Sequence, residues 1–475
     1  MSITRRVFLK ASAAVAVPIF VSSKVFGANE TINIGVIGLG IRGTQSHVPE
    51  FSKLSGVRVT ALADPDKTRT ASTLKTMQEK GLNYQIDQYE DMRRVFDRTD
   101  IHAVSIATMN HWHALATIWA CQAGKHVYVE KPLSHFIWEG RQMVNAAKKY
   151  NRIVQHGTQL RSCPSIVEAI KWTKAGNLGK ILYVTAFANK VRQSIGKRQE
   201  PLPLPNDFNY DLWCGPAQAD PIYRNKIQYD CSFTWNMGDG ESLNQGVHQI
   251  DVARWLLGIE GMPKRTLSMG GRFLFNDAGD VPNTQIIYYD YPDVPILYST
   301  YNLSESKNSK KAENFRFTSV GITIDCENGW VGISHSPYCV AYDKNDKIIQ
   351  KWSTGGDHFQ NFVNAVRNGN NNDLASDVLC GHLSTRIGHA GNISYRLGER
   401  ANVSEQKKVV ADYPYFAEMH ERYLKHLAAH EIDPNETILG RWLECDTENE
   451  CFVGNDDAYK FARGSYRKPY LIPNL

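Results

Sequence analysis

A lysine, an asparagine and a histidine in this sequence are of the types that stabilise charge, orient a hydroxyl or take a proton when an alcohol is oxidised. Asn244 and His248 are four residues apart, so on a helix their side chains would share one face. Histidine titrates near neutral pH and can take the proton of a hydroxyl as hydride leaves its carbon. The ammonium of Lys131, placed nearby, would hydrogen-bond the same oxygen and stabilise the developing alkoxide. These three are the candidate catalytic groups, although a lone helical histidine is more often structural.

A glycine-rich segment near the N-terminus indicates where the hydride would go. An apolar, β-branched run leads into Gly38-x-Gly40-x-x-Gly43, and an amphipathic segment follows. In such a strand, turn and helix, the first glycine makes the turn, the second admits a pyrophosphate and the third lets the helix pack closely. Asp64 ends the next strand, where its carboxylate can accept both ribose hydroxyls and would repel a 2′-phosphate. The pattern therefore predicts NAD rather than NADP.

The elements that must position these residues alternate between strand and helix up to about residue 157. Buried strands are expected at Arg58–Ala63, Ala103–Ala107, His126–Glu130 and Ile153–Gly157, with helices at Asp91–Arg98, His111–Ala123 and Ile137–Lys149. This is typical of a doubly wound parallel sheet, which binds ligands beyond the carboxyl ends of its strands. Further cofactor-binding candidates lie at those ends or in the glycine loop: Ile41, Arg42, Thr108, Asn110, His113, Glu130, Lys131 and Gln159.

From about residue 180 the pattern changes to longer β-rich stretches. They are Ile181–Ala188, Thr266–Leu274, Gln285–Tyr289, Ile296–Tyr301, Phe315–Gly321 and Trp330–Ile333. A helix from Leu243 to Leu257, ended by Gly258, carries Asn244 and His248. We expect a dinucleotide domain over residues 28–160, an α/β substrate domain over 161–400 and an ordered extension over 401–475.

The first 27 residues have the pattern of an export signal. Arg5 and Arg6 precede Phe-Leu-Lys and a short apolar run, which predicts a twin-arginine signal peptide and a periplasmic protein. The run is too short and too rich in alanine for a membrane span, so no stable membrane insertion is expected. Twin-arginine export carries folded proteins, and free NAD is scarce outside the cytoplasm. Tightly bound, internally recycled NAD is therefore expected.

Composition excludes several classes of partner. The formal net charge is +5, and no basic block interleaved with aromatics indicates nucleic acid. Nine cysteines are scattered without a Cys-x-x-Cys pair, so no metal site is expected. Cys445 and Cys451 could form one bridge in an oxidising compartment, or remain buried thiols.

Taken jointly, the motifs resemble the glucose–fructose oxidoreductase, inositol dehydrogenase and rhizopine-catabolism (Gfo/Idh/MocA) family, and its exported branch most closely. Besides the glycine fingerprint, they are Glu130-Lys131-Pro132, Gly157–Ser162, Gly246–Trp255, Pro282–Gln285 and Gly381–Ser394. The resemblance implies a Rossmann domain followed by an α/β domain with a large, open, mostly antiparallel sheet. It also implies that this sheet mediates homodimers or homotetramers, that Lys131 is the active-site lysine and that His248 transfers the proton.

One departure from the family pattern concerns Asn244, where many members have aspartate. Asparagine cannot act as a base, so the proton role falls on His248, and Asn244 would orient a sugar hydroxyl through its amide. Arg161 and Tyr223 are further substrate-binding candidates, and His389 is a secondary candidate with an equally plausible structural role.

Three functions remain open at this point. The first is NAD-dependent oxidation of a ring hydroxyl of a sugar or glycoside, at C3 in one version, which gives a 3-keto-glycoside. The second is an NAD-dependent glycosidase that oxidises C3 transiently, eliminates the aglycone and adds water, with Tyr223 or Tyr229 as the extra base near C2. The third is a binding protein that keeps NAD as a structural ligand, which the retained Lys131 and His248 disfavour.

Overall fold

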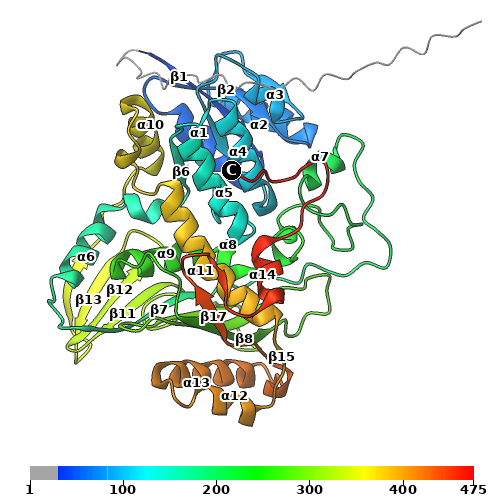
Figure 1. The fold of residues 1–475 in the computed structure, drawn as a ribbon. Helices are drawn as coiled ribbons and strands as arrows, with labels where there is room; N and C mark the ends of the chain where they lie inside the picture. The colour runs from blue at the N-terminus through cyan, green and yellow to red at the C-terminus, as the bar shows by residue number, and fades with distance from the viewer. Residues whose placement is uncertain (1–29, 83) are drawn as a thin grey trace, which may run out of the picture.

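Two sheets, one above the other in Figure 1, organise the protein. The structure is a computed structural model that describes residues 30–82 and 84–475. The proposed signal peptide therefore lies outside the described residues, and export stays a prediction. Within the described part of the chain, no helix is long and apolar enough to cross a membrane.

The first sheet has six parallel strands in the order β3-β2-β1-β4-β5-β6. The strands are β1 (Ile32–Ile37), β2 (Val57–Ala63), β3 (Asp87–Tyr89), β4 (Ala103–Ile106), β5 (His126–Val129) and β6 (Val154–His156). The helices are α1 (Val48–Ser52), α2 (Lys67–Glu79), α3 (Arg93–Phe96), α4 (Asn110–Gln122) and α5 (Ile137–Lys149). The predicted doubly wound sheet is confirmed, and strand order reverses beside β1, where such sheets bind ligands.

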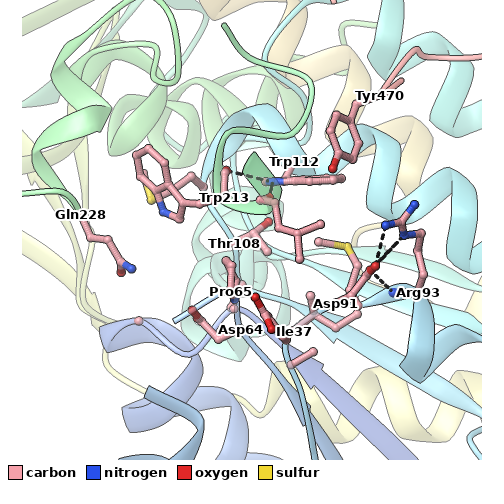
Figure 2. Close-up of a pocket in the computed structure, with 18 residues that line it drawn as sticks. Ile37, Asp64, Pro65, Asp91, Arg93, Thr108, Trp112, Trp213, Gln228 and Tyr470 are labelled. Carbon is pink, nitrogen blue, oxygen red and sulfur yellow. Dashed lines mark hydrogen bonds and ion pairs between the residues drawn. The ribbon is translucent and has the colours of Figure 1, made fainter. Parts of the chain in front are cut away.

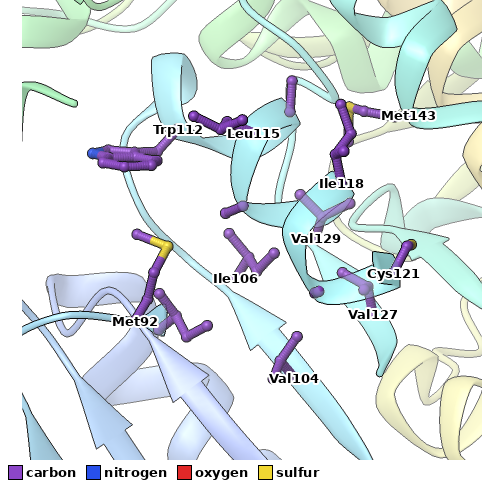
Figure 3. Close-up of a cluster of buried hydrophobic side chains, with 14 of the residues drawn as sticks. Met92, Val104, Ile106, Trp112, Leu115, Ile118, Cys121, Val127, Val129 and Met143 are labelled. Carbon is purple, nitrogen blue, oxygen red and sulfur yellow. The ribbon is translucent and has the colours of Figure 1, made fainter. Parts of the chain in front are cut away.

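Apolar side chains on both faces explain why this sheet is buried. Figure 3 shows Val104 and Ile106 of β4 packed beneath Leu115 and Ile118 of α4. All four are fully buried. Strands buried on both faces are nearly continuous runs of β-branched residues, which is why the sequence pattern identified them.

The second sheet is mostly antiparallel, as expected, with one parallel pair between β7 and β10. Its long strands are β7 (Ile181–Ala188), β8 (Arg265–Gly271), β9 (Thr284–Asp290), β10 (Ile296–Tyr301), β11 (Val320–Cys326), β12 (Gly329–Ser334), β13 (Cys339–Asp343) and β14 (Ile348–Trp352). Short strands β15 (Glu399–Arg400), β16 (Ile438–Leu439), β17 (Leu443–Asp446) and β18 (Cys451–Phe452) extend it.

Three predicted elements in this half had wrong bounds, of which the strand expected at Thr266–Leu274 ends at Gly271. The strand expected at Phe315–Gly321 begins only at Val320, because Arg316 has a positive φ of 57° and Phe315 pairs back with Thr318 in a tight turn. The helix expected from Leu243 to Leu257 is divided into α8 (Glu241–Asn244) and α9 (Gly246–Leu257). Asn244 and His248 therefore lie on opposite sides of a helix break.

The remaining helices connect the two sheets and cover the second one. They are α6 (Pro164–Lys174), α7 (Tyr210–Cys214), α10 (His358–Asn368), α11 (Val378–Arg396), α12 (Val403–Val410), α13 (Pro414–Ala429) and α14 (Asp456–Arg463). Helix α10 packs on the first domain through Phe359 and Phe362. The C-terminal residues Tyr470 and Ile472 pack into the second apolar cluster of that domain, on the side of α4. Helices α12 and α13 cover the outer face of the second sheet (Figure 1).

Cys445 and Cys451 lie on the hairpin β17–β18 and are free thiols. Cys445 is opposite Phe452, and Cys451 is opposite Asp446. Because neighbouring residues of a strand point to opposite faces, the two thiols lie on different faces of the hairpin.

Candidate functional site

The glycine loop between β1 and α1 has the geometry of a phosphate-binding turn. Gly38 has φ of +84°, and a Cβ there would lie 2.7 Å from the Ala107 carbonyl. A Cβ on Gly43 would lie 1.9 Å from the carbonyl oxygen of Gly38, so both positions require glycine. A Cβ on Gly40 would meet no atom within 4 Å, which leaves open space for a ligand close to the backbone. The loop thus fits the pyrophosphate of a dinucleotide.

Asp64 lies at the carboxyl end of β2 and faces the same crevice. Its carboxylate accepts hydrogen bonds from the backbone N–H groups of Leu39 (2.7 Å) and Asp66 (2.9 Å). Burial nevertheless raises the pKa of Asp64 to about 6. Ribose hydroxyls donating to this carboxylate would favour its charged form, so the buried acid suits that partner.

An apolar pocket beside Asp64 is built from three distant parts of the chain (Figure 2). The first domain contributes Ile37, Thr108 and Trp112, the segment after β7 contributes Trp213, and the C-terminal segment contributes Tyr470. The indole N–H of Trp112 donates to the carbonyl oxygen of Trp213 at 3.1 Å. The hydroxyl oxygen of Thr108 is buried without a partner among the described residues. An apolar slot with one unpaired hydroxyl suits an adenosine.

The three candidate catalytic residues meet where the two domains face each other. Lys131, just beyond β5, donates from Nζ to the Asn244 carbonyl oxygen at 2.5 Å, with the Asn244 amide oxygen at 3.5 Å. The His248 ring centroid lies 5.0 Å from that of His335, and its Nδ1 is buried without a partner in the described structure. Burial, followed by the neighbouring His335 and the positive charge of Lys131, holds the pKa of His248 well below its usual value. His248 is therefore a neutral imidazole, able to accept a proton.

Glu130, the neighbour of Lys131 in the chain, is ion-paired with the glycine loop. Its buried carboxylate accepts a hydrogen bond from Nε of Arg42 at 2.7 Å and contacts Nε2 of His47 at 3.0 Å. Burial alone would raise the pKa of Glu130, but Arg42, His47 and Lys131 together outweigh burial and hold the pKa well below its usual range. This ion pair joins the glycine loop to the end of β5, so cofactor loop and Lys131 are held together. Burial lowers the pKa of Lys131 as well.

Other predicted cofactor residues lie near the crevice but bind protein groups. His113 contacts the carbonyl oxygens of Pro132 (2.6 Å) and Thr108 (3.1 Å) through its two ring nitrogens. Asn110 donates to the Asp239 carboxylate at 2.8 Å. Ile41 is 68% exposed, whereas Oε1 of Gln159 is buried without a partner within the part of the chain described.

The predicted substrate residues Arg161 and Tyr223 are not brought to Lys131. Arg161 forms a buried two-point ion pair with Asp251, at 2.8 and 3.0 Å. Tyr223 lines a separate surface groove that also contains Lys197. Nε2 of His389 contacts the Ser134 carbonyl oxygen at 3.0 Å, and its Nδ1 lies 4.0 Å from the carboxylate of Asp239.

Lys190, Arg192 and Glu241 near Asn244 were not anticipated, whereas Tyr229 was a candidate base. Lys190, which follows β7, donates to the Gln245 side chain at 2.5 Å. Arg192 binds Glu241 through two hydrogen bonds, at 2.8 and 3.0 Å. The Asn244 amide donates to the Tyr229 hydroxyl at 3.2 Å. The only available signal was that Lys190 and Arg192 follow the end of a predicted strand. Among residues 30–82 and 84–475, no group of three or more His, Cys, Asp or Glu could hold a metal ion.

Comparison with known proteins identifies the two halves. Residues 32–158 match an oxidoreductase family model with an NAD-binding Rossmann fold, and residues 167–307 match the C-terminal α/β domain of the same family, Gfo/Idh/MocA. The chain belongs to this family. The sequence-based recognition of the family is thereby confirmed, whereas membership of its exported branch stays a prediction. The glycine loop, Asp64 and the apolar pocket fit the NAD of the family description.

Two curated relatives illustrate the range of family members. Levoglucosan dehydrogenase of Pseudarthrobacter phenanthrenivorans is 32% identical over 260 residues, 51% of this chain and 57% of that protein. A glycosyl hydrolase family 109 protein of Solibacter usitatus is 30% identical over 178 residues, 36% of this chain and 40% of that protein. The chain thus matches about half the length of these relatives.

A solved structure of levoglucosan dehydrogenase, in complex with NADH and levoglucosan, has the same fold. It superposes with a TM-score of 0.57 at 20% identity, covering 76% of this chain and 96% of the other.

Proposed function

We propose that this protein is an NAD-dependent oxidoreductase that oxidises a ring hydroxyl of a sugar or glycoside, with hydride leaving the carbon that bears the hydroxyl. The observation that carries the proposal is the contact of Lys131 with Asn244 beside the neutral His248, at the edge of the cofactor crevice. The names of the relatives, which include a levoglucosan dehydrogenase, support a carbohydrate substrate. Oxidation at C3, giving a 3-keto-glycoside, is the version that we favour.

The proposed chemistry assigns one task to each side chain. The substrate hydroxyl binds between Lys131 and His248, whose unpaired Nδ1 and neutral ring leave it free to accept the proton. Lys131 donates a hydrogen bond to the same oxygen and stabilises its developing negative charge. The amide of Asn244 orients a neighbouring hydroxyl. Bound NAD supplies the hydride acceptor.

We further propose that NAD is held tightly and in preference to NADP. The adenosine pocket is closed by Tyr470, whose hydroxyl donates to Asp211 at 2.9 Å, and by Trp213 of α7. Both segments would have to move before the cofactor could leave. The buried Asp64 disfavours a 2′-phosphate by charge. A retained cofactor suits an exported enzyme, because a second sugar can reoxidise it within the site.

The alternative is an NAD-dependent glycoside hydrolase, and one contact favours it. That mechanism needs a base near C2, and the hydroxyl of Tyr229 lies 3.2 Å from the Asn244 amide. Tyr229 is 44% exposed, so its hydroxyl is accessible from solvent. The family 109 relative supports this candidate.

The test is to purify the protein, release any bound NAD by denaturation, and incubate native protein with a panel of glycosides. Reduced nicotinamide absorbance with a product lighter by two hydrogens supports the oxidoreductase. Free sugar and aglycone without net redox change support the hydrolase.

Single substitutions test the roles proposed for His248 and Lys131. His248→Ala should lower turnover by about 10²- to 10⁴-fold while NAD stays bound. Lys75→Met, which removes an exposed lysine of α2, serves as a control for Lys131→Met. Near-normal turnover in His248→Ala would overturn the proposed proton acceptor.

A further inference from the structure

A second cleft, separate from the catalytic site, opens between the first domain and the C-terminal helix α14. It has a volume of about 650 Å³, within the range of small-molecule sites. Its lining contains neither Lys131 nor Asn244 nor His248. Its walls include the aromatic rings of Trp235 and Tyr459. The cleft therefore combines sufficient volume with flat apolar surfaces.

Arg396, at the end of α11, presents an unpaired cation to this cleft. Its guanidinium carbon lies 3.9 Å from the ring centroid of Phe461 and 4.9 Å from that of Trp235. No ion pair or hydrogen bond involves this guanidinium among the residues that the structure describes. Two cation–π contacts hold the group in place while its N–H donors remain free. A fixed guanidinium with free donors matches a carboxylate, which it binds through two hydrogen bonds.

His135 provides an independent indication of a ligand. The residue is 4% exposed and lines the cleft, and its Nε2 is buried without a partner in the described chain. Its Nδ1 lies 2.8 Å from the carboxylate of Asp239. Burial disfavours the charged imidazole, but Asp239 outweighs it and raises the pKa of His135. Buried polar atoms are normally paired, so this nitrogen marks a position for a hydrogen-bonding group.

The charge of the cleft also favours an anion. Its cations are Arg396, Arg463 and Lys460, of which Lys460 already pairs with Asp457. Its carboxyl groups are Asp220 and Glu139, and burial raises the pKa of Glu139 to about 7. Among the residues that line the cleft, the positive groups therefore outweigh the negative ones near neutral pH. Outside the lining, the carboxylates of Asp280 and Asp239 also act on Arg396.

We propose that this cleft binds a carboxylate attached to a ring, with the carboxylate on Arg396 and the ring against the aromatic walls. Two sources share this chemistry: a uronic acid and an aromatic acid. The site lies outside the proposed catalytic cleft, so its test does not depend on turnover.

The experiment is calorimetric titration of the purified protein, with its bound cofactor, using D-glucuronate and benzoate, with D-glucose and benzamide as uncharged controls. We expect at least one carboxylate to bind ten-fold or more tightly than its uncharged control. Arg396→Gln should weaken that binding ten-fold or more, whereas Arg441→Gln, a surface arginine paired with Glu399, should not. Tyr459→Ala, which removes a 51% exposed wall residue, tests the ring contact should the Arg396 variant fail to fold.

The outcomes separate the sources and the sites. Binding of glucuronate alone identifies a sugar acid, and binding of benzoate alone identifies an aromatic acid. The proposal is overturned if neither carboxylate binds, if Arg396→Gln and Tyr459→Ala both bind like the unmodified protein, or if Lys131→Met removes the binding instead.

Discussion

Replacing Arg161 with glutamine distinguishes a substrate-binding role from a structural one. The guanidinium binds both oxygens of the Asp251 carboxylate, which is fully buried. Ser384 donates to the same carboxylate at 2.6 Å, and a second guanidinium, of Arg254, lies 3.9 Å away. Removing one partner of a buried ion pair costs about 3–5 kcal/mol. Since Arg254 retains part of the favourable field, we expect the lower end, about 3 kcal/mol.

The pH dependence of this loss follows from Asp251. Burial raises its pKa, but Arg161 outweighs burial, so the pKa in the folded protein is lowered. The pair therefore stabilises the fold above the unfolded pKa of about 3.9 and stops doing so as pH falls through the folded pKa. In Arg161→Gln, burial dominates and the Asp251 pKa rises. The destabilisation should be largest near pH 8 and smaller near pH 5, where the carboxyl can protonate.

The assay is urea unfolding of both proteins at pH 5 and pH 8, followed by tryptophan fluorescence, together with KM for the glycoside identified. The double variant Arg161→Met, Asp251→Leu should recover part of the lost stability, because it removes the buried carboxylate that has lost its main partner. Arg254 then keeps its hydrogen bonds to Ser384 and to the Ile259 carbonyl oxygen. Arg400→Gln, which breaks an exposed pair, should change stability by less than about 1 kcal/mol. Unchanged stability with a raised KM would refute the structural role and restore Arg161 as a substrate ligand.

Three further predictions concern the cofactor and the proton. Asp64→Asn should weaken NAD retention about ten-fold, because a charge-assisted hydrogen bond to the ribose is lost. The measurement is the NAD content of the protein after gel filtration, and full retention would contradict the ribose role. Tyr470→Ala should speed NAD release about ten-fold in a competition experiment. The Tyr470 ring packs edge-on against Trp112, with the ring centroids 5.4 Å apart, and its hydroxyl donates to Asp211. An unchanged rate would show that the C-terminal segment does not retain the cofactor. His248 must be neutral to accept a proton, and its pKa is lowered, so kcat/KM should fall only below pH 6.5 as pH decreases. A decline that already begins above pH 7 would argue against His248 as the proton acceptor.

The sequence predicted the first domain well because the determinants there are local. The strand Ala103–Ala107 is an apolar run buried on both faces, and Gly38 requires a backbone that only glycine adopts readily. The position of Asp64 at a strand end followed from the same pattern. Periodicity and turn chemistry are sufficient for such elements.

The substrate side was less predictable because its contacts join distant segments. The break at Gln245 places Asn244 against Lys131, 113 residues away. Arg161 was assigned from its motif, but its partner Asp251 lies 90 residues further on. Lys190 enters the site because β7 ends there; the strand end was predictable, but its contact with Gln245, 55 residues away, was not. These arrangements are set by tertiary packing.

Helices α12 and α13 have a consequence for how copies of this protein can associate. Phe416, Met419 and Tyr423 of α13 bury the apolar side chains of β8, β9 and β10 within the same chain. A contact of this kind between two subunits would weaken on dilution, by mass action. Here the partner surface is covalently attached, so the burial is independent of protein concentration. The expected homo-oligomer stays a prediction, and the apolar side chains that these helices cover are not free to form its interface.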